Sequence, residues 1–266
     1  MATPRVLVLT GYGINCDDET RFAFGFQRAG GSANLVHIND LIESPGKLDN
    51  YQIVAFPGGF SYGDDTGSGN GLAQKIRNHL GVERFVSNDK LVIGICNGFQ
   101  VLDNLGLVPA LDNRYGERQA ALAHNQFPRY KCDWIDLQFL GTSPWVSGVE
   151  TISLPIAHGE GNFYCKPSVL QRLKEKGLIA ARYVKGEICE FHGKEPNPNG
   201  SLDDIAGITD ESGRILGMMP HPERAIEFLQ LPHWTYLKAK NGWKSSELPV
   251  EGPGLQIFRN GVNYFK

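Results

Sequence analysis

Four short, continuous apolar runs in the first half of the chain place the strongest constraint on its fold. Each run is four or five residues long, and longer segments of helical character separate them. The runs span residues 6–9, 35–38, 53–56 and 91–95. Uninterrupted apolar runs of this length are typical of strands buried on both faces, as in a parallel sheet. We therefore predict an α/β fold with an open, doubly wound, mostly parallel sheet and flanking helices.

The segments between these runs supply the helices. Phe22, Phe26 and Ala29 recur at helical spacing, and Leu72 and Ile76 begin a second stripe that continues to residue 80. Apolar stripes of this kind face a core. We predict that both stripes cover the sheet.

The second half of the chain has a different pattern. Strand-like segments cover residues 134–139, 150–157, 179–184, 205–209 and 215–219. The last two flank a turn signal, Asp210–Gly213, and so predict a hairpin. These segments predict strands added to the parallel sheet in antiparallel orientation. We treat residues 1–266 as a single domain, with a surface insertion at 229–253 and a C-terminal docking helix at 254–265.

Charge and cysteine content limit the function classes. The formal net charge is −3 and the pI is about 6.2, with no basic stripe, which argues against nucleic acid as a partner. The five cysteines form no CxxC pair and indicate a reducing compartment. No apolar run has the length of a membrane span or of a signal peptide. We expect a cytoplasmic protein without a membrane partner.

Cys96 lies between two glycines, Gly94 and Gly98, at the junction of an apolar run and a helix-like segment. A residue held at such a sharp strand-to-helix turn needs neighbours almost without side chains. The turn also places the sulfur at a helix N-terminus, which favours a thiolate. We interpret the motif as a nucleophile elbow, and a buried, inert cysteine is the alternative.

A cysteine nucleophile requires a base, and the base requires a group that orients it. His221 and Glu223 follow the last predicted strand with Pro222 between them. The two-residue spacing allows both side chains to lie on one side, so that Glu223 accepts a hydrogen bond from the imidazole. We predict a catalytic triad of Cys96, His221 and Glu223.

A glycine loop, Pro57–Phe60, follows the strand predicted at residues 53–56. Its backbone amides are free to face a ligand at the same sheet edge as Cys96. An amide of Gly59 or Phe60, together with that of Asn97, would form an oxyanion hole. A plain strand-ending turn is the alternative.

Two further segments carry weaker signals. Gly11–Cys16 begins like a dinucleotide fingerprint, but Cys16 replaces the third glycine, so we reject nucleotide binding there. His158 and Gly159 follow a predicted strand and could line a pocket. The other histidines and cysteines show no metal-ligand spacing, and we expect neither a metal nor a cofactor in this chain.

The motifs together resemble the class I glutamine amidotransferases, whose fold is flavodoxin-like. They are most similar to the glutaminase subunits of phosphoribosylformylglycinamidine synthases, enzymes of purine biosynthesis. The wider resemblance rests on residues 57–64, 94–100 and 220–224, and the narrower one rests on residues 60–64, 157–161, 197–201 and 218–224, in the same order along the chain.

This resemblance implies a mechanism and a partner. Cys96 would attack the side-chain amide of glutamine and His221 would protonate the departing ammonia. The glutamine pocket would include Gly58, Gly98, Gln100, His158 and Gly159. Ammonia would pass to a separate synthetase subunit that uses ATP and Mg²⁺, and the resemblance leaves open a small accessory subunit as a further partner.

Two other functions stay open on the sequence alone. The first is another class I amidotransferase glutaminase or a related cysteine hydrolase with the same elbow. The second is a regulatory subunit that has lost activity.

Overall fold

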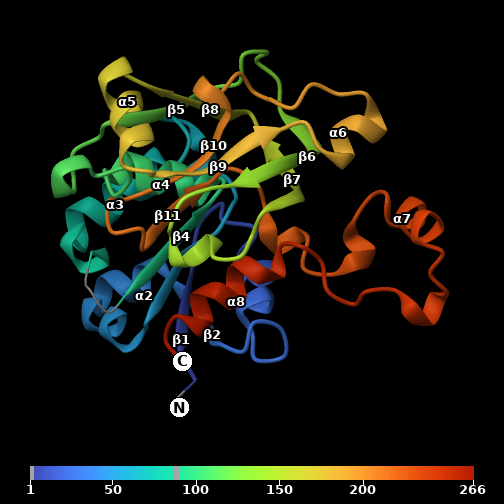
Figure 1. Ribbon diagram of the computed structural model, residues 1–266. Coiled ribbons are helices and arrows are strands. Elements are labelled where there is room, and N and C mark those ends of the chain that lie inside the picture. The colour runs from blue at the N-terminus through green and yellow to red at the C-terminus, as the bar shows by residue number, and fades with distance from the viewer. Residues whose placement is uncertain (1–2, 87–89) are drawn as a thin grey trace.

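A nine-stranded mixed sheet forms the centre of the chain in the computed structural model, which describes residues 3–86 and 90–266 (Figure 1). The strand order in this sheet is β2-β1-β3-β4-β11-β10-β9-β6-β7, and β5 and β8 form a separate two-stranded sheet. The strands are β1 (Arg5–Thr10), β2 (Ser32–His37), β3 (Ile53–Phe56), β4 (Leu91–Ile95), β5 (Ala120–His124), β6 (Lys131–Phe139), β7 (Thr151–His158), β8 (Glu160–Cys165), β9 (Ile179–Val184), β10 (Ile205–Thr209) and β11 (Ile215–Met218).

Parallel pairing joins β2, β1, β3, β4 and β11, and antiparallel pairing joins β10, β9, β6 and β7. The predicted α/β fold with added antiparallel strands is therefore confirmed. The β3 and β4 strands are buried along their whole length, which is why their sequences are continuously apolar. Because β4 and β11 are parallel neighbours with Ile95 opposite Met218, the residues that follow each strand emerge at the same sheet edge.

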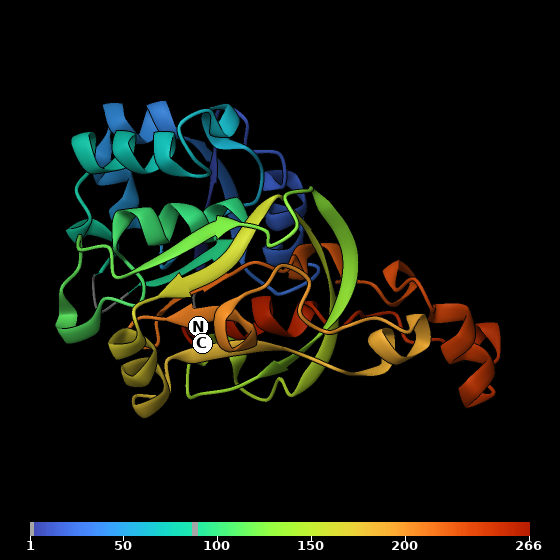
Figure 2. The same ribbon diagram turned by 90° about the horizontal axis from the view of Figure 1, so that it is seen from above.

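Helices cover both faces of the sheet. They are α1 (Asp17–Phe24), α2 (Ile38–Glu43), α3 (Asn70–His79), α4 (Asn97–Leu105), α5 (Pro167–Glu175), α6 (Glu187–His192), α7 (Trp234–Asn241) and α8 (Leu255–Asn263). The α1 and α8 helices contact each other through the rings of Phe24 and Phe258, whose centroids are 4.8 Å apart. The α3 and α4 helices form a second pair, and Figure 2 shows this pair and α8 separated by the sheet.

The first predicted helical stripe is wrong. Helix α1 ends at Phe24, and the side chains of Phe22 and Phe26 are 47% and 77% exposed. Thr20, Ala23 and Phe24 face the core instead. The ring of Phe22 stacks on the Arg28 guanidinium, 4.8 Å away, so it stays at the surface. The second stripe is correct, because Leu72 and Ile76 are buried in α3.

The C-terminal part divides into a protruding and a packed segment. Figures 1 and 2 both show α7 held away from the sheet, and this helix has no buried residue. Helix α8 packs on the body of the chain, with Leu255, Phe258 and Val262 buried. No helix in the described parts of the chain combines the length and apolar character needed to cross a bilayer.

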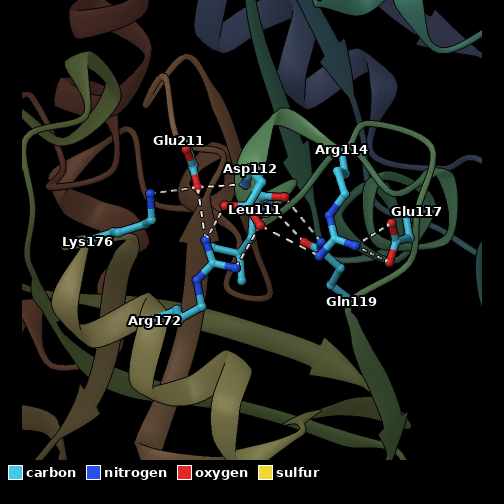
Figure 3. Close-up of polar contacts among 8 residues, drawn as sticks. All are labelled: Leu111, Asp112, Arg114, Glu117, Gln119, Arg172, Lys176 and Glu211. Atoms are coloured by element: carbon cyan, nitrogen blue, oxygen red, sulfur yellow. Dashed lines mark hydrogen bonds and ion pairs between the residues drawn. The ribbon is translucent and has the colours of Figure 1, made fainter.

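The loop after α4 is held to α5 by charged side chains (Figure 3). Asp112 has a left-handed backbone, with φ of 62°, and Arg172 of α5 donates to both of its carboxylate oxygens. The Glu211 carboxylate accepts from the Asp112 amide at 2.8 Å and pairs with Lys176 at 3.0 Å. These contacts fix the loop that leads away from the C-terminal end of α4.

Candidate active site

Cys96 occupies a sharp turn between β4 and α4. Its backbone has φ of 52° and ψ of −108°, a region that residues with a side chain rarely adopt. Its amide donates to the carbonyl of Met218 on β11 at 2.8 Å, which fixes the turn to the sheet. A Cβ atom at Gly98 would lie 1.8 Å from the Phe56 carbonyl oxygen, and one at Gly94 would lie 2.6 Å from that of Gly98. Only glycine fits at both positions, so the turn has the geometry of the predicted elbow.

The thiol of Cys96 is almost enclosed, because the residue is only 4% exposed. Its Sγ lies 3.6 Å from the carbonyl oxygen of Ala157, near the end of β7. The sulfur therefore lies between the first turn of α4 and the β7 strand end that leads to His158.

His221 and Glu223 form a buried pair directly after β11. Each is 1% exposed, and Nδ1 of His221 lies 2.5 Å from Oε1 of Glu223. The backbone between them makes a short 3₁₀ turn that begins at Pro222. Because Nδ1 bonds the carboxylate, Nε2 is the nitrogen available for chemistry, and it makes no hydrogen bond within the described structure.

Burial and charge act in opposite directions on the pKa of His221. Burial lowers it, whereas the carboxylate of Glu223 and the thiols of Cys96 and Cys16 raise it, and the net pKa lies well above the usual value. Such an imidazole holds a proton readily and can deliver it to a leaving amine. By contrast, burial lowers the pKa of His158 to about 3, so this second histidine is neutral at physiological pH.

The glycine loop after β3 presents one free amide rather than two. The carbonyl of Gly58 accepts from the amides of Asn15 and Cys16, both at 3.2 Å. Within the planar peptide the Gly59 amide points the opposite way, away from that contact. The Phe60 amide is already bonded to the carbonyl of Gly13 at 2.7 Å. Of the two amides predicted for the oxyanion hole, that of Phe60 is occupied in this conformation, and Gly59 is the available donor.

Asn97 offers the second candidate amide. It is the first residue of α4, where a backbone N–H has no partner inside the helix. Its side-chain oxygen accepts from the amide of Ser61 at 3.2 Å, which joins the glycine loop to the elbow. The Gly59 amide in the glycine loop and the Asn97 amide at the start of α4 therefore lie on two segments that are joined by a hydrogen bond.

The residues predicted to bind glutamine lie around this centre. Gln100, in the first turns of α4, donates from Nε2 to the carbonyl of Glu160, and it also accepts from the side chain of Asn97 at 3.0 Å. His158 is 3% exposed and is held by Asn199, whose Nδ2 is 3.0 Å from His158 Nε2. Both side chains are thus fixed by the protein itself.

The three glycines in the predicted pocket differ in their surroundings. A Cβ atom at Gly58 would lie 2.8 Å from Cε1 of His221, so this glycine permits close approach of the imidazole. A Cβ atom at Gly159 would contact nothing within 4 Å. Gly98 contacts β3, as described above, and serves the elbow.

Arg224, Cys16 and Tyr130 lie near the site and were given no role in the sequence analysis. Arg224 donates from Nη2 to Sγ of Cys16 at 2.9 Å, across 208 positions of sequence. Burial raises the pKa of Tyr130, and the charge of Cys96 adds to the rise, which places this phenol near the nucleophile. Its ring centroid is 6.0 Å from that of Phe60. The only sequence feature that could have pointed to one of these three residues is the position of Arg224 directly after Glu223.

A family model described as a CobB/CobQ-like glutamine amidotransferase domain matches residues 3–265. The chain belongs to this family. It is 46% identical to phosphoribosylformylglycinamidine synthase subunit PurQ of Methanococcus maripaludis, over 98% of this chain and 97% of the relative. It is 40% identical to the protein of the same name from Dehalococcoides mccartyi, over 99% and 98% of the two chains.

Solved structures agree with these sequence relatives. A chain of the PurLQS structure from Thermotoga maritima matches with a TM-score of 0.72 and 30% identity, and all of both chains is covered. A putative GMP synthase subunit from Thermoplasma acidophilum matches with a TM-score of 0.55 and 14% identity, which shows a shared fold alone. The family model thus covers residues 3–265, a range that includes α7.

Proposed function

We propose that this chain is the glutaminase subunit of a phosphoribosylformylglycinamidine synthase. It hydrolyses glutamine to glutamate and ammonia, and the ammonia passes to an ATP-dependent synthetase that makes formylglycinamidine ribonucleotide in purine biosynthesis. The names and full-length similarity of the PurQ relatives support the assignment. The observation that carries it is the elbow cysteine after β4 together with the buried His221–Glu223 pair after β11, the neighbouring parallel strand.

The reaction begins when the Cys96 thiolate attacks the side-chain amide carbon of glutamine. The amides of Gly59 and Asn97 donate to the negative oxygen of the tetrahedral intermediate, and one such donor contributes about 3 kcal/mol in other acyl-transfer enzymes. The carbon–nitrogen bond then breaks as His221 gives its proton to the departing ammonia. A thioester of glutamate remains on Cys96.

Water completes the cycle. His221 takes a proton from the water molecule that attacks the thioester, and the thiolate leaves as glutamate is released. Glu223 keeps the imidazole in one tautomer and orientation throughout, through its bond to Nδ1.

The partner would be the synthetase subunit, which would bind ATP and Mg²⁺. The PurLQS structure that matches over its whole length supports an assembly of this kind. The five cysteines are all free, which suits a reducing cytoplasm.

The test uses the complex reconstituted with the synthetase. We expect Cys96→Ala to abolish synthesis from glutamine and to leave synthesis from added ammonium salt intact. Cys189→Ala, at a buried cysteine in α6, is the matched control and should retain both activities. Glutamine-dependent synthesis by Cys96→Ala at the wild-type rate would refute the proposal.

A cysteine peptidase with the same elbow is the alternative enzyme. Comparing ammonia release from free glutamine with cleavage of peptides separates these two activities. Covalent labelling of Cys96 by a glutamine-analogue electrophile separates an active glutaminase from an inactive regulatory subunit.

A further inference from the structure

The loop Gly11–Cys16, which begins like a nucleotide fingerprint, forms part of the active-site wall. Ile14 makes a β-bridge with Gly59, and the Cys16 amide donates to the carbonyl of Gly58 at 3.2 Å. These bonds attach the loop to the segment that carries the candidate oxyanion donor. Cys16, at the end of the loop, is thereby brought next to the imidazole of His221.

The thiol of Cys16 is completely buried and uses both of its hydrogen-bonding capacities. Its sulfur accepts from Nη2 of Arg224 at 2.9 Å, and its S–H points to Oδ1 of Asn15 at 3.2 Å. Its Sγ lies within 4.8 Å of ligand atoms of both His221 and Glu223. The sulfur therefore connects Arg224 to the pair that would move the proton.

The surroundings of Gly58 show how little space there is beside the imidazole ring of His221. A Cβ atom at Gly58 would lie 2.8 Å from Cε1 of His221 and 3.1 Å from Sγ of Cys16. The ring and the thiol thus both occupy the space where a side chain at position 58 would begin. If the sulfur were removed, a gap would open beside the imidazole, and Arg224 would lose its acceptor.

Cys16, His221 and Glu223 are close enough together to suggest a site for a soft divalent cation such as zinc. Arg224 already supplies a positive charge to the sulfur, and the carboxylate of Glu223 is bonded to the imidazole. A metal ion would have to displace both interactions. The cluster is better explained by a structural contact with the base.

We propose that Cys16 is a positioning residue for His221, holding the imidazole at the place from which it serves Cys96. The proposal rests on the glutaminase function proposed above. Cys16 is 0% exposed, so it acts through His221 and not by touching glutamine. Its loss should lower kcat while leaving the KM for glutamine nearly unchanged, since a displaced base slows the chemical step.

The experiment compares Cys16→Ala, Cys16→Ser and the control Cys189→Ala in the complex with the synthetase. Each is assayed with glutamine and with ammonium salt. We expect Cys16→Ala to lower the glutamine-dependent kcat by about tenfold, with KM changed by less than about twofold and ammonia-dependent synthesis unchanged. Cys16→Ser should recover most of the loss, because a hydroxyl can still accept from Arg224. Cys189→Ala should match the wild type.

A wild-type kcat in Cys16→Ala would overturn the proposal. So would thermal unfolding showing that the free Cys16→Ala and Cys16→Ser subunits are already unfolded at the assay temperature, since that result would assign the thiol to folding. A rise in KM without a fall in kcat would likewise exclude a positioning role. If the proposed glutaminase function were wrong, the result would differ from all of these, because the wild-type complex itself would not use glutamine.

Discussion

Replacing Gly98 by alanine tests whether the contact between α4 and β3 sets the position of the nucleophile. The added Cβ would lie 1.8 Å from the carbonyl oxygen of Phe56 and 2.6 Å from its carbonyl carbon. Ordinary van der Waals contact begins near 3.4 Å, so the first turn of α4 must move away from β3 by the difference, about 1.6 Å. The Phe56 carbonyl belongs to the backbone and the new Cβ atom is bonded directly to it, so neither group can rotate out of the contact.

This displacement falls on the residues that would do the chemistry. Cys96 and the Asn97 amide lie within two positions of Gly98, so they would move with the turn. A misplacement of about 1 Å can cost about 10²-fold in rate. We expect Gly98→Ala to lower the glutamine-dependent kcat by at least about a hundredfold. Overpacking of this kind costs about 1–3 kcal/mol of stability, so the chain should still fold.

The assay is synthesis from glutamine and from ammonium salt in the reconstituted complex, together with thermal unfolding of the free subunit. Gly46→Ala is the control, because a Cβ atom there would meet nothing within 4 Å. It should leave both activities unchanged. If Gly98→Ala kept a glutamine-dependent rate within about twofold of the wild type, the reasoning from the Phe56 contact would be wrong.

Two further substitutions test the charged groups. Glu223→Gln removes the charge that does most to raise the pKa of His221. The glutamine-dependent kcat should fall at least about a hundredfold, while ammonia-dependent synthesis persists. An unchanged kcat would contradict the proposed triad. Burial raises the pKa of Asp103 to about 7 despite Arg118. Between about pH 4 and 7 the unfolded chain loses this proton while the folded chain keeps it, so stability falls as pH rises, by up to about 1.4 kcal/mol per pH unit. Asp103→Asn should therefore gain stability relative to the wild type from pH 5 to pH 8 in urea unfolding, and a difference independent of pH would contradict this.

Strands β1, β3 and β4 could be predicted because their burial on both faces requires continuously apolar sequences, whereas the edge strand β2 is mostly exposed or half-buried. The strand before Cys96 is apolar at every position except Gly94, and that glycine is itself required by the elbow. The elbow could be identified for the same reason, since its backbone excludes side chains at the flanking positions. The proximity of His221 and Glu223 followed from their separation by a single proline.

Other features depend on packing that local patterns do not record. The apolar spacing that continues to Phe26 gives no sign that α1 ends at Phe24. The short β5 strand, with one face exposed, lacks the uninterrupted apolar character of β3 or β4. The contact of Cys16 with Arg224 joins residues 208 positions apart, and only the folded chain brings them together. The occupied amide of Phe60 likewise depends on a distant loop, through its bond to Gly13.

The parallel pairing of β4 with β11 has a consequence for regulation. Cys96 and His221 extend from adjacent strands, which are spaced by about 4.8 Å as in any sheet. That spacing is set by the backbone hydrogen bonds between two fully buried strands, so a signal at the surface would have to distort the sheet in order to change it. We therefore expect control of this enzyme to act on the entry of glutamine and the exit of ammonia and not on the spacing of β4 and β11.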